Sequence, residues 1–230
     1  AAITATGGSG ALKVVGGSGT GVTLTAGSGD GKVTSVTGRT GGTITINGNS
    51  DTANTGTITL TGNTGVTTFT VDAKLNTGDI TLNASDTTVD NSIAVTGSSA
   101  TGTVSGAINI KASAKTSSLT VDGQSNTGLI TADASLATGT AVVTVTAGLG
   151  AVKAYAGQAG GNVTVNGVTG SGDLSIFGNE TAAGTGDLKV DSGTGKITIT
   201  ANKQTGNIFA IGSDTANTIT IYGNSDTGSS

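Results

Sequence analysis

Apolar and polar residues alternate along the chain in short runs, and a turn rich in Gly, Asn, Asp or Ser follows each run. The unit is visible in GGTITINGN (41–49), TGTITLTGN (55–63), TGDITLNAS (77–85) and TGKITITAN (194–202). Strict alternation has a period of two, which places every second residue on one face of a β-strand. The pattern therefore predicts many short strands, each with about two apolar residues on its buried face.

The predicted buried pairs are Ile, Leu or Val residues two positions apart, and the Thr, Lys, Asp and Asn residues between them face water. Examples are Ile44 and Ile46, Ile58 and Leu60, Ile80 and Leu82, Val163 and Val165, Ile197 and Ile199, and Ile219 and Ile221. Two core residues are too few to stabilise an isolated hairpin. Stacking equivalent strands solves this problem, because each unit then covers the apolar pair of its neighbour and a continuous narrow core forms.

The spacing of the units distinguishes two all-β folds. Successive units are about 11 to 12 residues apart on average, as expected for regularly spaced short strands. Long and short steps compensate each other, so that alternate units are repeatedly about 22 residues apart, whereas hairpins of an antiparallel sandwich would vary freely in size. We therefore expect an all-β fold, a parallel β-solenoid with about two short strands and 22 residues per coil; a three-sided coil stays open as an alternative.

The solenoid is expected to be one continuous domain over residues 1–230. It would have about ten coils and a length of about 45 to 50 Å. The 41 Gly residues fit its corners, where Gly, Asn and Asp supply positive φ angles. The absence of Pro fits as well, because an interior strand needs its backbone N–H for the ladder.

The composition of the chain excludes most kinds of catalytic site. The chain has no His and no Cys, which excludes imidazole–thiol and zinc sites. Its only Glu is Glu180, its only Arg is Arg39, and no Asp pair lies in a recognisable catalytic setting. We therefore expect a protein that is not an enzyme and requires no cofactor.

The charge and the hydropathy of the chain narrow the range of partners that we expect. A net charge of −4 and a pI near 4.5 argue against a nucleic-acid partner, which needs a basic footprint. No apolar run approaches the roughly 18 to 20 residues that span a bilayer, so no membrane insertion is expected. The chain starts on AAITAT, which already reads as a strand, with no Met and no signal peptide. The numbering is therefore expected to start at a processed end or inside a longer protein.

Four Asp residues are weak candidates for calcium ligands. Asp30 lies in GSGDGKVTSV (27–36), the segment nearest to a calcium-binding nonapeptide repeat, and Asp51, Asp214 and Asp226 lie in three SDT turns. Asp also caps backbone amides in turns by default, and we favour that reading. Calcium binding stays possible without being required.

Outward Thr pairs suggest a second kind of surface. Flat Thr-x-Thr ladders on a solenoid resemble the face of ice-binding proteins, and the chain offers Thr43/Thr45, Thr57/Thr59, Thr198/Thr200 and Thr218/Thr220. Such a face must be regular over several coils. Lys32, Asp79, Lys111, Lys153 and Lys189 are expected at equivalent outward positions, where they would interrupt it. We therefore favour a plain structural role for Thr as a good strand former.

The aromatic residues are few and scattered: Phe69, Tyr155, Phe177, Phe209 and Tyr222. A carbohydrate-cleaving solenoid would need aromatic platforms and close carboxylates along a groove. We expect these five residues to fill gaps in the core or to mark a lateral contact.

Runs such as TGTITLTGN and TGKITITAN resemble the Thr/Gly/Ala-rich β-solenoid regions of bacterial S-layer proteins and large secreted adhesins. The resemblance extends over nearly the whole chain but concerns composition and period only. It implies an extracellular, cell-surface location and a structural role without enzymatic activity.

The ends of the repeat array point to the same role. Terminal repeats of a solenoid should be polar and atypical, yet AITAT near the start and TITIY near the end look like interior strands. We expect either a piece of a longer solenoid or a subunit that associates with itself, head-to-tail or laterally. The predicted function is a self-assembling subunit of a surface layer or filament, and the alternatives are an adhesin shaft or an ice-binding module.

Overall fold

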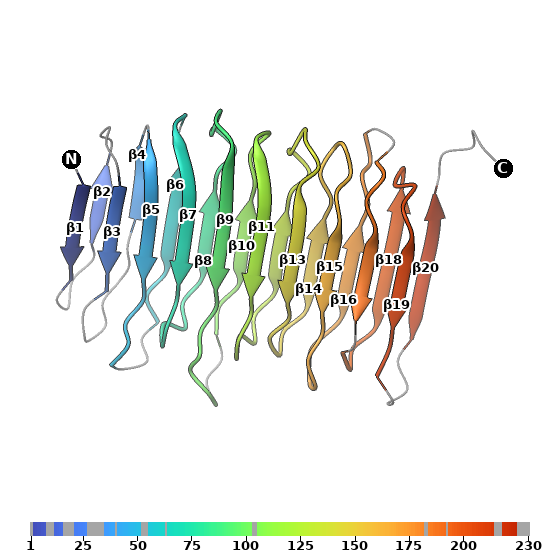
Figure 1. The fold of residues 1–230 in the computed structure, drawn as a ribbon. Coiled ribbons are helices and arrows are strands. Elements are labelled where there is room, and N and C mark those ends of the chain that lie inside the picture. Colours follow the sequence, from blue (N-terminus) through green and yellow to red (C-terminus); the bar gives the residue numbers. More distant parts are fainter. Residues whose placement is uncertain are drawn as a thin grey trace.

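The computed structural model describes residues 2–7, 12–15, 21–26, 41–51, 55–62, 64–102, 105–181, 184–191, 193–213 and 218–224, and the backbone of 35–39. Their strands form two parallel ten-stranded sheets, and no two consecutive strands share a sheet. Figure 1 shows the two sheets lying against each other, with odd-numbered strands pointing one way and even-numbered strands the other. The two-stranded coil of a parallel β-solenoid is thereby confirmed, and the described residues form no third sheet.

The odd-numbered strands form sheet A. Their bounds are β1 Ala2–Thr6, β3 Gly21–Thr25, β5 Gly42–Asn47, β7 Val66–Asp72, β9 Asn91–Thr96, β11 Thr116–Asp122, β13 Val142–Thr146, β15 Val163–Asn166, β17 Leu188–Asp191 and β19 Ile208–Ile211. The even-numbered strands form sheet B. Their bounds are β2 Lys13–Val15, β4 Ser35–Arg39, β6 Ile58–Gly62, β8 Ile80–Asn83, β10 Ile108–Lys111, β12 Ile130–Asp133, β14 Val152–Tyr155, β16 Leu174–Phe177, β18 Ile197–Asn202 and β20 Ile219–Asn224.

The register of the sheets confirms the predicted coil length. In sheet B, Ile108 pairs with Ile130, Ile130 with Val152 and Val152 with Leu174, so that one coil takes 22 residues there. Equivalent positions therefore lie directly above one another. Each apolar residue of a strand meets the apolar residue of the next coil, as stacking requires.

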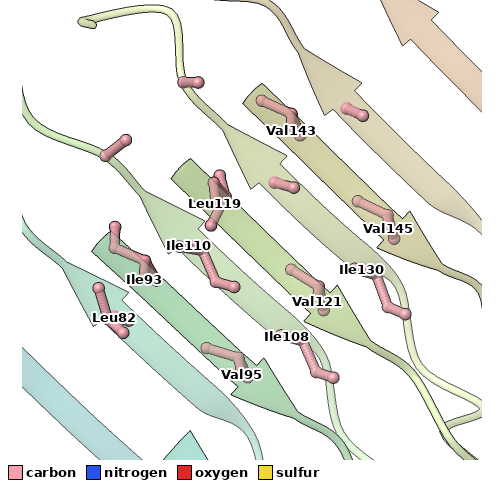
Figure 2. Close-up of a cluster of buried hydrophobic side chains, with 14 of the residues drawn as sticks. Leu82, Ile93, Val95, Ile108, Ile110, Leu119, Val121, Ile130, Val143 and Val145 are labelled. Carbon is pink, nitrogen blue, oxygen red and sulfur yellow. The ribbon is translucent and has the colours of Figure 1, made fainter. Parts of the chain in front are cut away.

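The core is a narrow layer between the sheets. Figure 2 shows its middle, with Ile108 and Ile110 on sheet B and Leu119 and Val121 on sheet A, and the four residues belong to one buried cluster. All four are buried. The alternating pattern read from the sequence is confirmed at Ile44 and Ile46 and at the other predicted pairs of the interior coils.

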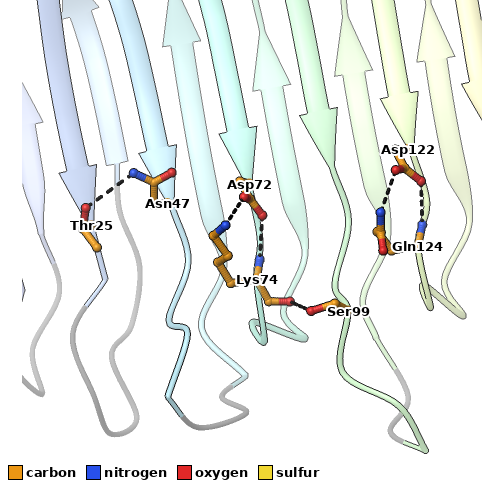
Figure 3. A network of polar contacts seen from close by, with 7 residues as sticks. All are labelled: Thr25, Asn47, Asp72, Lys74, Ser99, Asp122 and Gln124. Atoms are coloured by element: carbon orange, nitrogen blue, oxygen red, sulfur yellow. Dashed lines mark hydrogen bonds and ion pairs between the residues drawn. The ribbon is translucent and has the colours of Figure 1, made fainter.

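Two of the corners that follow sheet A, those after β7 and β11, bend through left-handed residues that are not glycine. Lys74 has φ 52° and Gln124 has φ 50°. In both corners an Asp two residues earlier accepts a hydrogen bond from the backbone N–H, Asp72 from Lys74 and Asp122 from Gln124, each at 3.1 Å (Figure 3). The carboxylate thus stabilises a conformation that an L residue rarely adopts.

At the corners that precede sheet B, glycine is needed for a reason other than a positive φ angle. At Gly78, Gly128 and Gly150 the φ angle lies outside the left-handed region, so that our expectation of positive φ was wrong there. A Cβ on Gly128 would lie 2.2 Å from the carbonyl oxygen of Gly106, and one on Gly150 would lie 2.1 Å from that of Gly128. These glycines let the backbones of successive coils approach closely.

Candidate functional site

The predicted calcium ligands are not brought together in the part of the chain that the structure describes. Asp30, Asp214 and Asp226 lie outside the described residues. Asp51 is exposed; its backbone N–H donates to Asn49 Oδ1 at 2.8 Å, and its carboxylate accepts from the Ser50 hydroxyl at 3.3 Å. No group of three or more acidic residues that could hold a metal ion occurs among the described residues. Calcium binding therefore stays a prediction.

The outward Thr residues are more regular on one face than the sequence suggested. In sheet A, the register places the following residues in one column: Thr4, Thr23, Thr45, Thr70, Ala94, Thr120, Thr144, Thr164, Lys189 and Phe209. Seven of the first eight are Thr, so that sheet A carries a long hydroxyl ladder.

Most of the residues expected to interrupt this ladder lie elsewhere. Lys111 and Lys153 belong to sheet B, on the opposite side of the molecule. Asp79 precedes β8, and Lys32 lies outside the described residues. Of the four of these residues that the structure describes, Lys189 alone stands in the sheet A column, where it ends the run of Thr after Thr164. The expected interruption is therefore confirmed in sheet A at Lys189, whereas Lys111 and Lys153 occupy outward positions of the other sheet.

The two ends of the stack leave apolar core residues open to solvent. Ile3 in β1 is 38% exposed, and Ile219 and Ile221 in β20 are 42% and 48% exposed. Their partners one coil inward, Ile197 and Ile199, are fully buried. Among the described strands, β1 and β2 form one edge of the two sheets and β19 and β20 form the other, which leaves backbone groups of these strands without a ladder partner.

The last coil is also apolar on its outer surface. In sheet A, Phe209 follows Lys189 in the column, and Ile211 follows Asp191. Phe209 is 47% exposed and Ile211 is 52% exposed. A strand that is apolar on both faces is typical of a strand covered on both faces.

Of the five aromatic residues, only Phe69 fills the core, where it is fully buried. Tyr155, Phe177, Phe209 and Tyr222 occupy outward positions of their strands, so that of the two expected roles the lateral contact stays a prediction for these four and gap filling does not apply. Tyr155 and Phe177 are register partners, and their rings stack with centroids 4.7 Å apart and planes 13° apart.

Tyr155 of this pair borders a hollow of about 510 Å³ near the ends of three neighbouring strands of sheet B. Asp133 and Tyr155 end β12 and β14, and residues of the turns that follow β12, β14 and β16 complete the wall. The polar and aromatic residues that line the hollow include Asp133, Tyr155, Gln158, Asn179, Glu180 and Thr181. None of the described residues that line the hollow is Lys or Arg.

Hydrogen bonds fix the far wall of this hollow. Buried Asn179 donates through its side-chain amide to the backbone carbonyl of Gln158, one coil earlier. Its Oδ1 accepts from the Thr181 backbone N–H at 2.9 Å and from the Thr181 hydroxyl at 3.0 Å. Two successive turns are thereby tied together, and the turn that carries Glu180 is held in place.

The chemistry of Tyr155 reflects these neighbours. Partial burial raises the pKa of the Tyr155 phenol above its ordinary value, and the negative charges of Asp133 and Glu180 raise it further. The raised pKa keeps the phenol protonated, and thus a hydrogen-bond donor, near neutral pH.

No protein-family model, curated protein or solved structure matches the chain. Nor does any described residue belong to a helix long and apolar enough to cross a membrane.

Proposed function

We propose that this chain is a non-catalytic structural protein of the cell exterior, a subunit of a surface layer or filament in which copies stack end to end through their open coils. The observation that carries the proposal is the exposure of core residues at both ends of the described stack. An uncovered apolar edge of a parallel sheet is a template for a further strand.

The two edges fit each other in residue type. If β19 of one copy lay beside β1 of the next, the inward residues Ile208 and Ala210 would meet Ile3 and Ala5. Each column would then pair Ile with Ile and Ala with Ala, as an interior coil pairs like with like. Stacking identical subunits in this way is a heterologous contact that does not close, and it produces a filament.

The other sheet allows the same join. If β20 lay beside β2 of the next copy, the exposed residues Ile219 and Ile221 would cover Leu12 and Val14, which already pack against the core at the first coil. One contact would thus extend both sheets and the core at once. Because Ile219 and Ile221 are already about half covered, burying the rest of each side chain stabilises the contact by about 1 kcal/mol per residue.

The extracellular location rests on composition. The lack of Cys and the abundance of Thr and Gly are typical of bacterial surface proteins. The repeat pattern also resembles that of S-layer and adhesin solenoids. In an adhesin shaft, the alternative role, the open edges would be covered by further coils of the same polypeptide instead of by a second copy.

Two matched substitutions in β20 test the stacking. Ile221→Lys places a charge in the core column at the open edge, and Tyr222→Lys places the same charge one residue away on the outer surface. Because burying an unpaired ammonium is costly, Ile221→Lys should abolish association while Tyr222→Lys leaves it intact, as measured by sedimentation velocity. A wild-type chain that stays monomeric, or a Tyr222→Lys variant that alone loses association, would contradict end-to-end stacking.

Ice binding is the second candidate, and the Thr column of sheet A favours it. A repeated hydroxyl array on a parallel sheet has strands about 4.8 Å apart, a regular spacing on which a water lattice could order. A monomeric chain that shows thermal hysteresis, lost on Thr45→Lys in sheet A but kept on Thr131→Lys in sheet B, would establish this function instead.

A further inference from the structure

We infer that the hollow beside Tyr155 binds a neutral saccharide, with the sugar ring stacked on the tyrosine. This inference is independent of the proposed stacking function, because the hollow lies on the outer side of β12, β14 and β16, away from the open coils.

The aromatic platform follows from the register. The centroid separation of 4.7 Å between Tyr155 and Phe177 equals the usual distance between neighbouring strands, so the ring planes stand across the stacking direction. Phe177 covers one face of Tyr155, and the other face is therefore turned toward Asp133 of β12. Asp133 is much shorter than Tyr155, which leaves room above it for a flat ligand against the open ring face.

The polar groups around the platform suit hydroxyl groups. The carboxylates of Asp133 and Glu180 accept hydrogen bonds, the Tyr155 phenol donates, and the Gln158 amide can do both. An apolar ligand would displace water from these groups without offering hydrogen bonds in return, which costs free energy. An anionic ligand would meet two carboxylates, and the lining residues that the structure describes include no cation.

The spread of the carboxylates argues for a polyol rather than an ammonium ion. Asp133 ends β12 and Glu180 follows β16, two strands further along sheet B, a separation of about 9 to 10 Å along the stack. An ammonium group pairs with oxygens within about 4 Å and would therefore leave one carboxylate unpaired. A hexose carries hydroxyl groups around its whole ring, and the volume of about 510 Å³ is within the usual range for small-molecule sites.

The test uses the 230-residue chain and the methyl glycosides of glucose, galactose, mannose and N-acetylglucosamine. Saturation-transfer NMR reports which ring protons of a glycoside touch the protein. Tyrosine fluorescence reports from the protein side, because the chain has no Trp and its only tyrosines are Tyr155 and Tyr222. In a Tyr222→Phe background the fluorescence comes from Tyr155 alone.

We expect at least one of the four glycosides to give saturation transfer and to change the Tyr155 fluorescence. Tyr155→Ala should abolish the transfer, and Asp133→Asn should weaken the affinity about tenfold, the loss expected for one hydrogen bond to a charged group. Tyr222→Ala is the matched control, because Tyr222 occupies the same outward column two strands beyond Phe177 and lies outside the hollow.

Choline, a ligand with an ammonium group, is titrated alongside the glycosides. Three results would overturn the inference: no saturation transfer to any of the four glycosides, saturation transfer that survives Tyr155→Ala, or a change in fluorescence with choline but with none of the glycosides. Sedimentation velocity reports association of the same samples separately, so that loss of stacking and loss of saccharide binding are distinguishable.

Discussion

Tyr155 shows how one residue can be tuned by its place in a repeated register. Neighbouring coils put a carboxylate on one side of it and an aromatic ring on the other, while the turn after β16 brings a second carboxylate near. The raised pKa of its phenol is a consequence of that arrangement.

The pKa of Tyr155 makes the stability of the fold depend on alkaline pH. The folded chain retains the phenolic proton at pH values where the unfolded chain, with a tyrosine pKa near 10.0, releases it. The free energy of unfolding should therefore be unaffected by this group below pH 10 and should fall as the pH rises beyond it. Denaturant unfolding at several pH values, compared between wild type and Tyr155→Phe, measures this term.

Removing a carboxylate gives a second readout at the same residue. Asp133→Asn should lower the pKa of Tyr155 toward its ordinary value without abolishing the shift, since burial is the largest cause. An ultraviolet titration of tyrosinate in the Tyr222→Phe background follows Tyr155 alone. A Tyr155 pKa unchanged by Asp133→Asn would mean that the carboxylate does not act on the phenol.

The coil is held by backbones that approach closely at its corners as well as by its apolar pairs. Gly128 and Gly150 lie one above the other before β12 and β14, each with its Cα against a carbonyl of the coil before. A side chain at either position would push two coils apart.

Gly150→Ala should therefore lower the free energy of unfolding by about 1 to 3 kcal/mol, the usual cost of overpacking. Gly139→Ala is the control, because a Cβ there meets nothing within 4 Å and the φ angle lies outside the left-handed region. Its effect should stay within about 0.5 kcal/mol, as for ordinary surface substitutions. Equal denaturation midpoints for the two variants would show that coil spacing does not depend on this glycine.

The sequence predicts the strands and the coil, but it does not show to which of the two sheets each strand belongs. Alternation identifies Ile108 and Ile110 as buried, and the 22-residue spacing identifies their neighbours. Which sheet a strand belongs to depends on its count from the start of the array. For that reason Lys111 and Lys153 were expected on the same face as Thr45, although they lie on the opposite one.

The hollow beside Tyr155 was missed for a related reason. VKAY (152–155) and LSIF (174–177) end in aromatic residues 22 positions apart, which is one coil, and this spacing is the signal that could have placed the rings side by side. Glu180 could not be placed in the same way, because it lies in a turn whose shape depends on the hydrogen bonds of Asn179.

At the scale of the whole molecule, the proposed filament depends on the open coils at the two ends of the stack. Interior apolar pairs are covered from both sides, whereas Ile3 and Ile221 are covered from one side only. In the filament that we propose, a second copy would supply that neighbour.

Electron microscopy of the purified chain at micromolar concentration tests this claim most directly. Ten strands per sheet at about 4.8 Å each predict filaments with an axial repeat of about 48 Å, with strands perpendicular to the filament axis. Separate particles about 48 Å long, or particles joined side by side with their end coils uncovered, would contradict it.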